Sequence, residues 1–279
     1  GDEAVICAPY WVSYPDMIKI AGAKPVILEA SIEDKFKINP KQLEESITNR
    51  TRLLIINNPS NPTGSCYSKK ELQALGKILV NFPNVTIVSD EIYEHIYWGD
   101  SSFSSFSEAC PQLYDQIVTV NGVSKAYAMT GWRIGYAAGP KQLITAMKTI
   151  QSQSTSNPCS ISQIAALAAL QGNQSALINM TKQYKKRHDY IFSAINQIKG
   201  FECCKGTGSF YIFPRIIGAL QEKNLKSDTE LVELLIREAN VACVPGSAFG
   251  APGYIRLSFA CSLKTLKEAV KRIKQVIMS

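Results

Sequence analysis

The sequence predicts an α/β fold in which a mostly parallel sheet is sandwiched by helices and is followed by a smaller α+β C-terminal domain. In the first half of the chain predicted strands alternate with predicted helices, which is typical of a parallel sheet covered by helices. After Gly200 the pattern changes to short strands and helices, which indicates a second lobe. A chain of 279 residues that is 46% hydrophobic is long enough to form both.

We expect the chain to divide into three parts. Residues 1–172 would form the larger domain, and residues 200–279 would form the smaller C-terminal domain. Between them, residues 173–199 would form a bridging helix, because the helical pattern over residues 175–198 is long enough to join two lobes. The sequence contains no internal repeat and no low-complexity segment.

Local signals justify the elements of the first half. Residues 85–89 form a short run rich in β-branched side chains, which is typical of a buried strand. Asn39 precedes a helix that begins at Pro40, and Ser68 with Glu71 forms the capping box of the next helix. We therefore expect strands at residues 4–8, 25–28, 53–56, 85–89, 117–121 and 132–138, and helices at residues 14–22, from 40 and from 69.

The second half is predicted to be richer in helices. Ser227 to Glu230 is the kind of segment that opens a helix, and residues 262–278 form an amphipathic terminal helix. Further helices are expected at residues 141–152, 160–171 and 175–198, and strands at residues 202–204, 208–213, 241–244 and 253–259.

Composition excludes several classes of protein. The net charge of +7 is mild and its lysines are spread over helix faces, which argues against a nucleic-acid surface. The eight cysteines show no paired metal-ligand spacing, so we expect no metal site and a reducing, cytoplasmic location. We also expect neither a membrane-spanning segment nor a signal peptide.

Three predicted strands run into three polar loops. Asn61 lies in the loop after the third strand, Asp90 ends the fourth and Lys125 follows the fifth. Because ligands of an open parallel sheet bind beyond the carboxyl ends of its strands, these residues are expected to converge. Ser124 and Arg133 flank the lysine and offer donors to a phosphate, so the combination points to pyridoxal phosphate.

Each candidate residue also has a purely structural interpretation. A Ser–Lys pair in a loop is commonly a solvated surface element, and an arginine in an apolar strand is commonly one half of an internal salt bridge. The remaining alternatives are core packing for Trp11, a strand-end aromatic for Tyr93, an Asx turn for Asn61, a helix N-cap for Asp90 and the salt bridge for Arg256.

Four motifs in register resemble those of class I aminotransferases of fold type I, and among these the bacterial aspartate aminotransferases of the gamma subgroup. The resemblance extends from Gly1 to the last predicted helix. The motifs are PYWVSYP at residues 9–15, NPSNPTG at residues 58–64, SDEIY at residues 89–93 and the segment at residues 124–135.

The resemblance implies catalytic roles for three residues. Lys125 would hold the pyridoxal 5′-phosphate as a Schiff base and then move the proton of the substrate α-carbon. Asp90 would pair with the ring nitrogen of the cofactor and keep it protonated. Tyr93, together with Asn61, would hydrogen-bond the phenolic oxygen.

The resemblance also implies binding roles for residues at both ends of the site. Ser124 and Arg133 would hold the phosphate, and Trp11 would lie flat against the cofactor ring. Arg256 would clamp the α-carboxylate of the substrate, with Trp11 and Asn61 beside it.

The implied activity is transamination between L-aspartate and 2-oxoglutarate by a homodimer. Kynurenine, aromatic, alanine and prephenate aminotransferases remain open as alternatives. So does a transcription regulator in which an aminotransferase-like domain senses pyridoxal phosphate.

The start of the chain departs from the family pattern, since it opens on a strand in what would be the middle of the large domain. The resemblance implies preceding elements, including a helix N-terminus that binds the phosphate through its amides. We therefore expect the chain to be a fragment that, by itself, binds the cofactor weakly and turns over little or no aspartate.

Overall fold

The computed structural model describes residues 1–278. Its main sheet has six strands in the order β2-β1-β3-β4-β5-β6. The first five strands are parallel and β6 is antiparallel to β5, which confirms the predicted mostly parallel sheet. The strands are β1 (Glu3–Ala8), β2 (Lys24–Glu29), β3 (Thr51–Asn57), β4 (Thr86–Asp90), β5 (Ile117–Gly122) and β6 (Gly135–Ala138).

Helices cover both faces of this sheet because its side chains alternate between them. Ala4 and Ile6 of β1 pack against α1 (Tyr14–Ile20), whereas Val5 between them packs with the opposite layer. That layer contains α2 (Pro40–Ser46), α3 (Lys69–Leu79) and α4 (Phe106–Ala109). The predicted capping box of α3 is present, and α2 has one as well, formed by Asn39 and Gln42.

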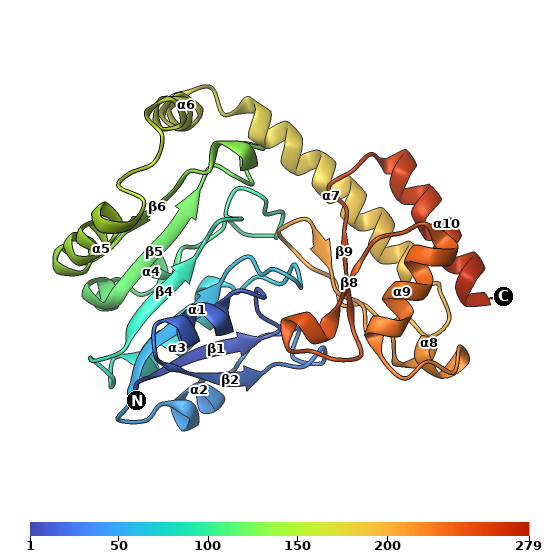
Figure 1. Cartoon of the computed structure of the whole chain (residues 1–279), viewed down its shortest axis with the longest axis horizontal. Helices are drawn as coiled ribbons and strands as arrows, with labels where there is room; N and C mark the ends of the chain where they lie inside the picture. The colour runs from blue at the N-terminus through green and yellow to red at the C-terminus, as the bar shows by residue number, and fades with distance from the viewer. Residues whose placement is uncertain (279) are drawn as a thin grey trace.

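Three helices follow the main sheet in the chain, and the last of them runs toward the smaller lobe. α5 (Lys141–Ser154) and α6 (Ser160–Gln171) follow β6, and α7 (Ser175–Ile195) then runs from α6 to the helices of the C-terminal part (Figure 1). The exact division at residues 172 and 199 stays a prediction.

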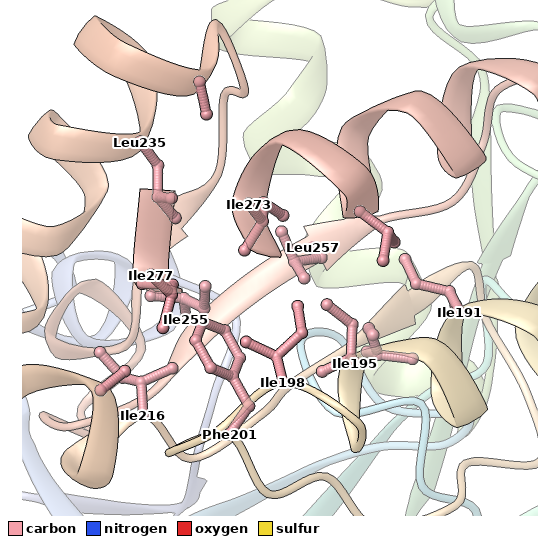
Figure 2. Packing of buried hydrophobic residues seen from close by; sticks show 14 of the residues in the cluster. Ile191, Ile195, Ile198, Phe201, Ile216, Leu235, Ile255, Leu257, Ile273 and Ile277 are labelled. Carbon is pink, nitrogen blue, oxygen red and sulfur yellow. The ribbon is translucent and has the colours of Figure 1, made fainter. Parts of the chain in front are cut away.

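The smaller lobe has a three-stranded antiparallel sheet in the order β7-β9-β8. Its elements are β7 (Tyr211–Ile212), α8 (Ile217–Glu222), α9 (Asp228–Ala239), β8 (Val244–Pro245), β9 (Ile255–Ser258) and α10 (Leu263–Met278). Each fully buried aliphatic side chain contributes about 1.5–3 kcal/mol to folding. Figure 2 shows how α7, β9 and α10 direct such side chains at one another, including Ile191, Ile195, Ile255, Leu257, Ile273 and Ile277.

Some predicted strands are shorter or absent. The strand predicted at residues 132–138 begins only at Gly135, because a 3-10 helix at Thr130–Trp132 and a left-handed Arg133 precede it. The strand predicted at residues 202–204 is a single bridge between Glu202 and Arg215. Two short helices, α4 and α8, were not predicted, since each is too short to show a clear period. Within residues 1–278, no helix is both long and apolar enough to cross a membrane.

Candidate active site

A cavity of about 380 Å³ lies at the carboxyl ends of the parallel strands and faces β9. In the sheet, β2 lies on one side of β1, whereas β3 and the later strands lie on its other side. The direction of strand addition therefore reverses between β1 and β3, and open sheets bind ligands at such a switch point. Six of the predicted residues line it. The complete lining is Trp11, Asn57, Asn61, Asp90, Ile92, Tyr93, Val120, Lys125, Tyr211 and Arg256.

Asp90 ends β4 and its carboxylate is held by two donors. The Tyr14 hydroxyl donates to Oδ2 at 2.5 Å, and the backbone N–H of Ile92 donates to Oδ1 at 3.2 Å. Burial raises the pKa of Asp90, while these hydrogen bonds and the Lys125 charge oppose the shift. The alternative interpretation of Asp90 as a helix N-cap is wrong, because residues 92–95 form turns and no helix follows Asp90.

Lys125 follows β5 and its half-buried side chain reaches the cavity. The pKa of its amine is lowered, first by burial and then by the positive charges of Arg133 and Arg256, whereas Asp90 opposes the shift. An amine with a lowered pKa has a larger unprotonated, nucleophilic fraction near neutral pH. The interpretation of this lysine as a solvated surface side chain is therefore not supported.

Asn61 is positioned by the loop that follows β3. The Asn57 side chain accepts a hydrogen bond from the Asn61 N–H at 2.7 Å and donates to the Asp90 carbonyl at 3.0 Å. Gly64 has φ of +71°, and a Cβ there would lie 2.7 Å from the Tyr211 carbonyl oxygen. The loop thus requires glycine for its conformation and for its close approach to β7. An Asx turn was the alternative interpretation of Asn61. In this loop, however, the side chain that accepts a backbone N–H is that of Asn57.

Arg256 lies in the middle of β9, between two residues whose side chains face the core. Strand alternation turns its own side chain toward the cavity. The guanidinium donates to Asn61 Oδ1 at 3.0 Å and lies 4.4 Å from the ring centre of Tyr211 and 4.9 Å from that of Phe249. Among the described residues it forms no ion pair, so the internal salt bridge is not found.

The two aromatic candidates differ in exposure. Trp11 is 38% exposed and meets the Tyr14 ring edge-on at 5.4 Å, so it is not a core residue. Tyr93 is 3% exposed and packs against Phe210 and Tyr211. Burial, reinforced by the neighbouring Tyr211 hydroxyl, raises the pKa of Tyr93 well above its usual value, so its hydroxyl remains a donor.

Ser124 and Arg133 do not line the cavity, although both were predicted as site residues. Ser124 is half-buried beside Lys125. Arg133 is exposed, its backbone is left-handed with φ of +55°, and its Nη1 donates to the Thr130 carbonyl at 2.9 Å. Its positive charge still contributes to the lowered pKa of Lys125.

The sequence interpretation missed four contacts of the site. Tyr14 lies inside the PYWVSYP motif, and Asn57 directly precedes the NPSNPTG motif that contains Asn61, so both lie in or beside a recognisable motif. Tyr211 and Phe249 carried no local signal, because an aromatic residue in a short apolar segment is ordinarily a core residue. In residues 1–278, no group of three or more His, Cys, Asp or Glu side chains is placed to hold a metal ion.

A six-stranded, mostly parallel sheet with a lysine, a carboxylate and an arginine around one cavity defines the chain as an enzyme of fold type I. The family comparison makes this more specific. The chain belongs to the family described as aminotransferase class I and II, whose model matches residues 1–273.

Relatives and solved structures agree with this assignment. The chain is 51% identical to an aspartate/prephenate aminotransferase of Nitrosomonas europaea, covering 99% of this chain and 71% of the relative. It is 50% identical to an aspartate aminotransferase of Geobacillus stearothermophilus, covering 98% and 69%. The crystal structure of the aspartate aminotransferase from Rhizobium meliloti superimposes with a TM-score of 0.95 at 43% identity, covering 100% of this chain and 71% of that chain.

Proposed function

We propose that this chain supplies the cavity, at the carboxyl ends of the strands, in which an aminotransferase binds pyridoxal 5′-phosphate and transfers the amino group of L-aspartate to 2-oxoglutarate. The observation that carries the proposal is the position of Lys125, Asp90 and Arg256 around one cavity. The family to which the chain belongs uses this cofactor.

The donors around the cavity fit the cofactor. Asp90 offers a half-buried carboxylate that would accept from the protonated ring nitrogen, and Tyr93 and Asn61 offer donors to the phenolic oxygen. Trp11 offers an exposed aromatic face. The cavity volume of about 380 Å³ also fits, because small-molecule sites range over about 300–1,000 Å³.

Ser124 and Arg133 would hold the phosphate beyond Lys125. The Arg133 guanidinium uses Nη1 for the Thr130 carbonyl and carries further N–H donors that suit an anion. The Ser124 hydroxyl adds a donor next to the lysine. A phosphate in this position would also offset the mutual repulsion of Arg133 and Lys125.

Lys125 is the proposed covalent and proton-transfer residue. Its amine would condense with the aldehyde of the cofactor with loss of water. Once the substrate amine has displaced it, the free amine would take the proton from the substrate α-carbon at Nζ. When bound, the cofactor supplies an electron-accepting ring, which Asp90 keeps protonated. The lowered pKa of Lys125 supports both roles, since each requires the unprotonated amine.

Arg256 is proposed to bind the α-carboxylate of both substrates. It has no anionic partner among residues 1–278, and Asn61 with two aromatic rings holds its guanidinium in place. A planar guanidinium and a carboxylate form two parallel hydrogen bonds.

The choice of aspartate is supported by the names of the relatives. Prephenate is a second candidate, because the relative from Nitrosomonas europaea is named for both substrates. No relative quoted above is named as a transcription regulator, so that alternative gains no support.

We further propose a homodimer, a cytoplasmic location and the division into residues 1–172, 173–199 and 200–279. Exposed apolar side chains on α6 support a second copy as partner, because a helix with apolar residues on all sides is ordinarily covered. These side chains are Ile161, Ile164, Leu167 and Leu170.

The test is to trap the cofactor on its lysine. After incubation with pyridoxal 5′-phosphate and reduction by borohydride, mass spectrometry should find the added group on the peptide that contains Lys125. The Lys125→Ala variant should lose this label and all transamination, whereas Lys148→Ala, at an exposed lysine of α5, should keep both. A label on another lysine, or none, would refute the proposal.

A further inference from the structure

Tyr14 touches two of the residues that are proposed to contact the cofactor. Its hydroxyl donates to Asp90 Oδ2 at 2.5 Å, and its ring meets the Trp11 ring at 5.4 Å with an interplanar angle of 89°. The side chain is 6% exposed and does not line the cavity itself. Tyr14 therefore lies directly behind the site.

The fold holds Tyr14 firmly. It is the first residue of α1, a helix with proline in its first turn, and it packs in a buried cluster with Ile6, Ile18 and Ile55. Moving the hydroxyl would thus disturb the packing between α1 and the sheet. Asp90 is 76 residues away in sequence, so the hydrogen bond joins α1 to β4.

We propose that Tyr14 is a positioning residue for the cofactor: its hydroxyl holds the Asp90 carboxylate in the orientation that meets the ring nitrogen, and its ring supports Trp11. Because Ile92 N–H holds Oδ1 while Tyr14 holds Oδ2, the two donors together fix the carboxylate plane. This inference rests on the proposed function, in which Asp90 faces the cofactor.

The hydrogen bond also controls the charge of Asp90. Burial favours the protonated acid, and the Tyr14 hydroxyl is the first of the contacts that favour the anion. The other titratable groups that face Asp90 are Lys125, whose charge favours the anion, and Tyr93. Loss of the hydroxyl should therefore move the protonation of Asp90 to higher pH.

The test compares Tyr14→Phe with Tyr67→Phe. Tyr67 is also a buried tyrosine, but its hydroxyl accepts from the Ile38 N–H and has no contact with Asp90. The dissociation constant of pyridoxal 5′-phosphate would be measured by fluorescence quenching from pH 5 to pH 9, with thermal unfolding as the check on folding. A charge-assisted hydrogen bond lost in Tyr14→Phe should weaken binding about tenfold at neutral pH.

The pH profile of cofactor binding distinguishes a positioning role of Tyr14 from a role in fold stability alone. In Tyr14→Phe the acid-side loss of cofactor affinity should begin at higher pH, whereas Tyr67→Phe should keep the parent profile. In an Asp90→Asn background, Tyr14→Phe should add no more than about a twofold loss, because its effect acts through Asp90.

Two outcomes would overturn the inference. A Tyr14→Phe profile that coincides with the parent protein would refute it while the proposed function stands. A full additional loss in the Asp90→Asn background would show that Tyr14 acts independently of Asp90. If the parent protein binds no pyridoxal 5′-phosphate, the proposed function fails first and the role of Tyr14 fails with it.

Discussion

Replacing Arg256 by lysine tests the proposed carboxylate site most directly. In the parent protein one nitrogen of the guanidinium donates to Asn61 Oδ1, and the group lies against the rings of Tyr211 and Phe249. Its remaining N–H groups are therefore available to a planar anion. Lysine keeps the positive charge but replaces the flat fork by a single ammonium group. The substitution therefore keeps the positive charge at position 256 but removes the planar arrangement of N–H donors.

The expected magnitude follows from the hydrogen bond that is lost. A hydrogen bond to a charged group contributes about 1.5–3 kcal/mol, and about 1.4 kcal/mol corresponds to a factor of ten in affinity. Losing one of the two parallel bonds should thus raise KM by about 10- to 150-fold. Because substrate and product both carry an α-carboxylate, the rise should appear for the amino acid and for the oxo acid alike.

The assay is steady-state transamination with each substrate varied in turn. Arg52→Lys is the matched control, since Arg52 is an exposed arginine of β3 whose charge pairs with Asp2 on the surface. The control should retain both KM values. If Arg256→Lys also retains both, the carboxylate lies elsewhere and the reasoning from the unpaired guanidinium is wrong.

Two more substitutions probe the cofactor and the loop of Asn61. Asp90→Asn should still bind pyridoxal 5′-phosphate at saturation but lose several orders of magnitude in turnover. The reason is that a neutral amide no longer keeps the ring nitrogen protonated. Near-normal turnover would contradict this role of Asp90. Gly64→Ala should destabilise the fold by about 1–3 kcal/mol in urea unfolding, since φ is +71° and the new Cβ would meet the Tyr211 carbonyl at 2.7 Å. Gly22→Ala is the control, with a similar φ of +77° but nothing within 4 Å, and equal losses for the two variants would show that only backbone strain matters.

The sequence was sufficient for features that depend on neighbouring residues. The alternation of strands and helices predicted the parallel sheet, and the helix starts after Asn39, Ser68 and Ser227 are confirmed by their cap hydrogen bonds. These features follow from chain periodicity and from contacts over three residues, which operate before any tertiary contact forms. The convergence of Asn61, Asp90 and Lys125 was predictable for a related reason, because parallel strands present their carboxyl ends at one edge.

Only the tertiary structure decided which partner each polar group finds. Arg256 meets Asn61 across 195 residues, and Tyr14 meets Asp90 across 76 residues. From the sequence alone, an internal salt bridge also remained open for Arg256, and Tyr14 had no assigned partner. The physical reason is that burial and hydrogen bonding of a side chain depend on the packing of several elements, and no local pattern encodes that packing.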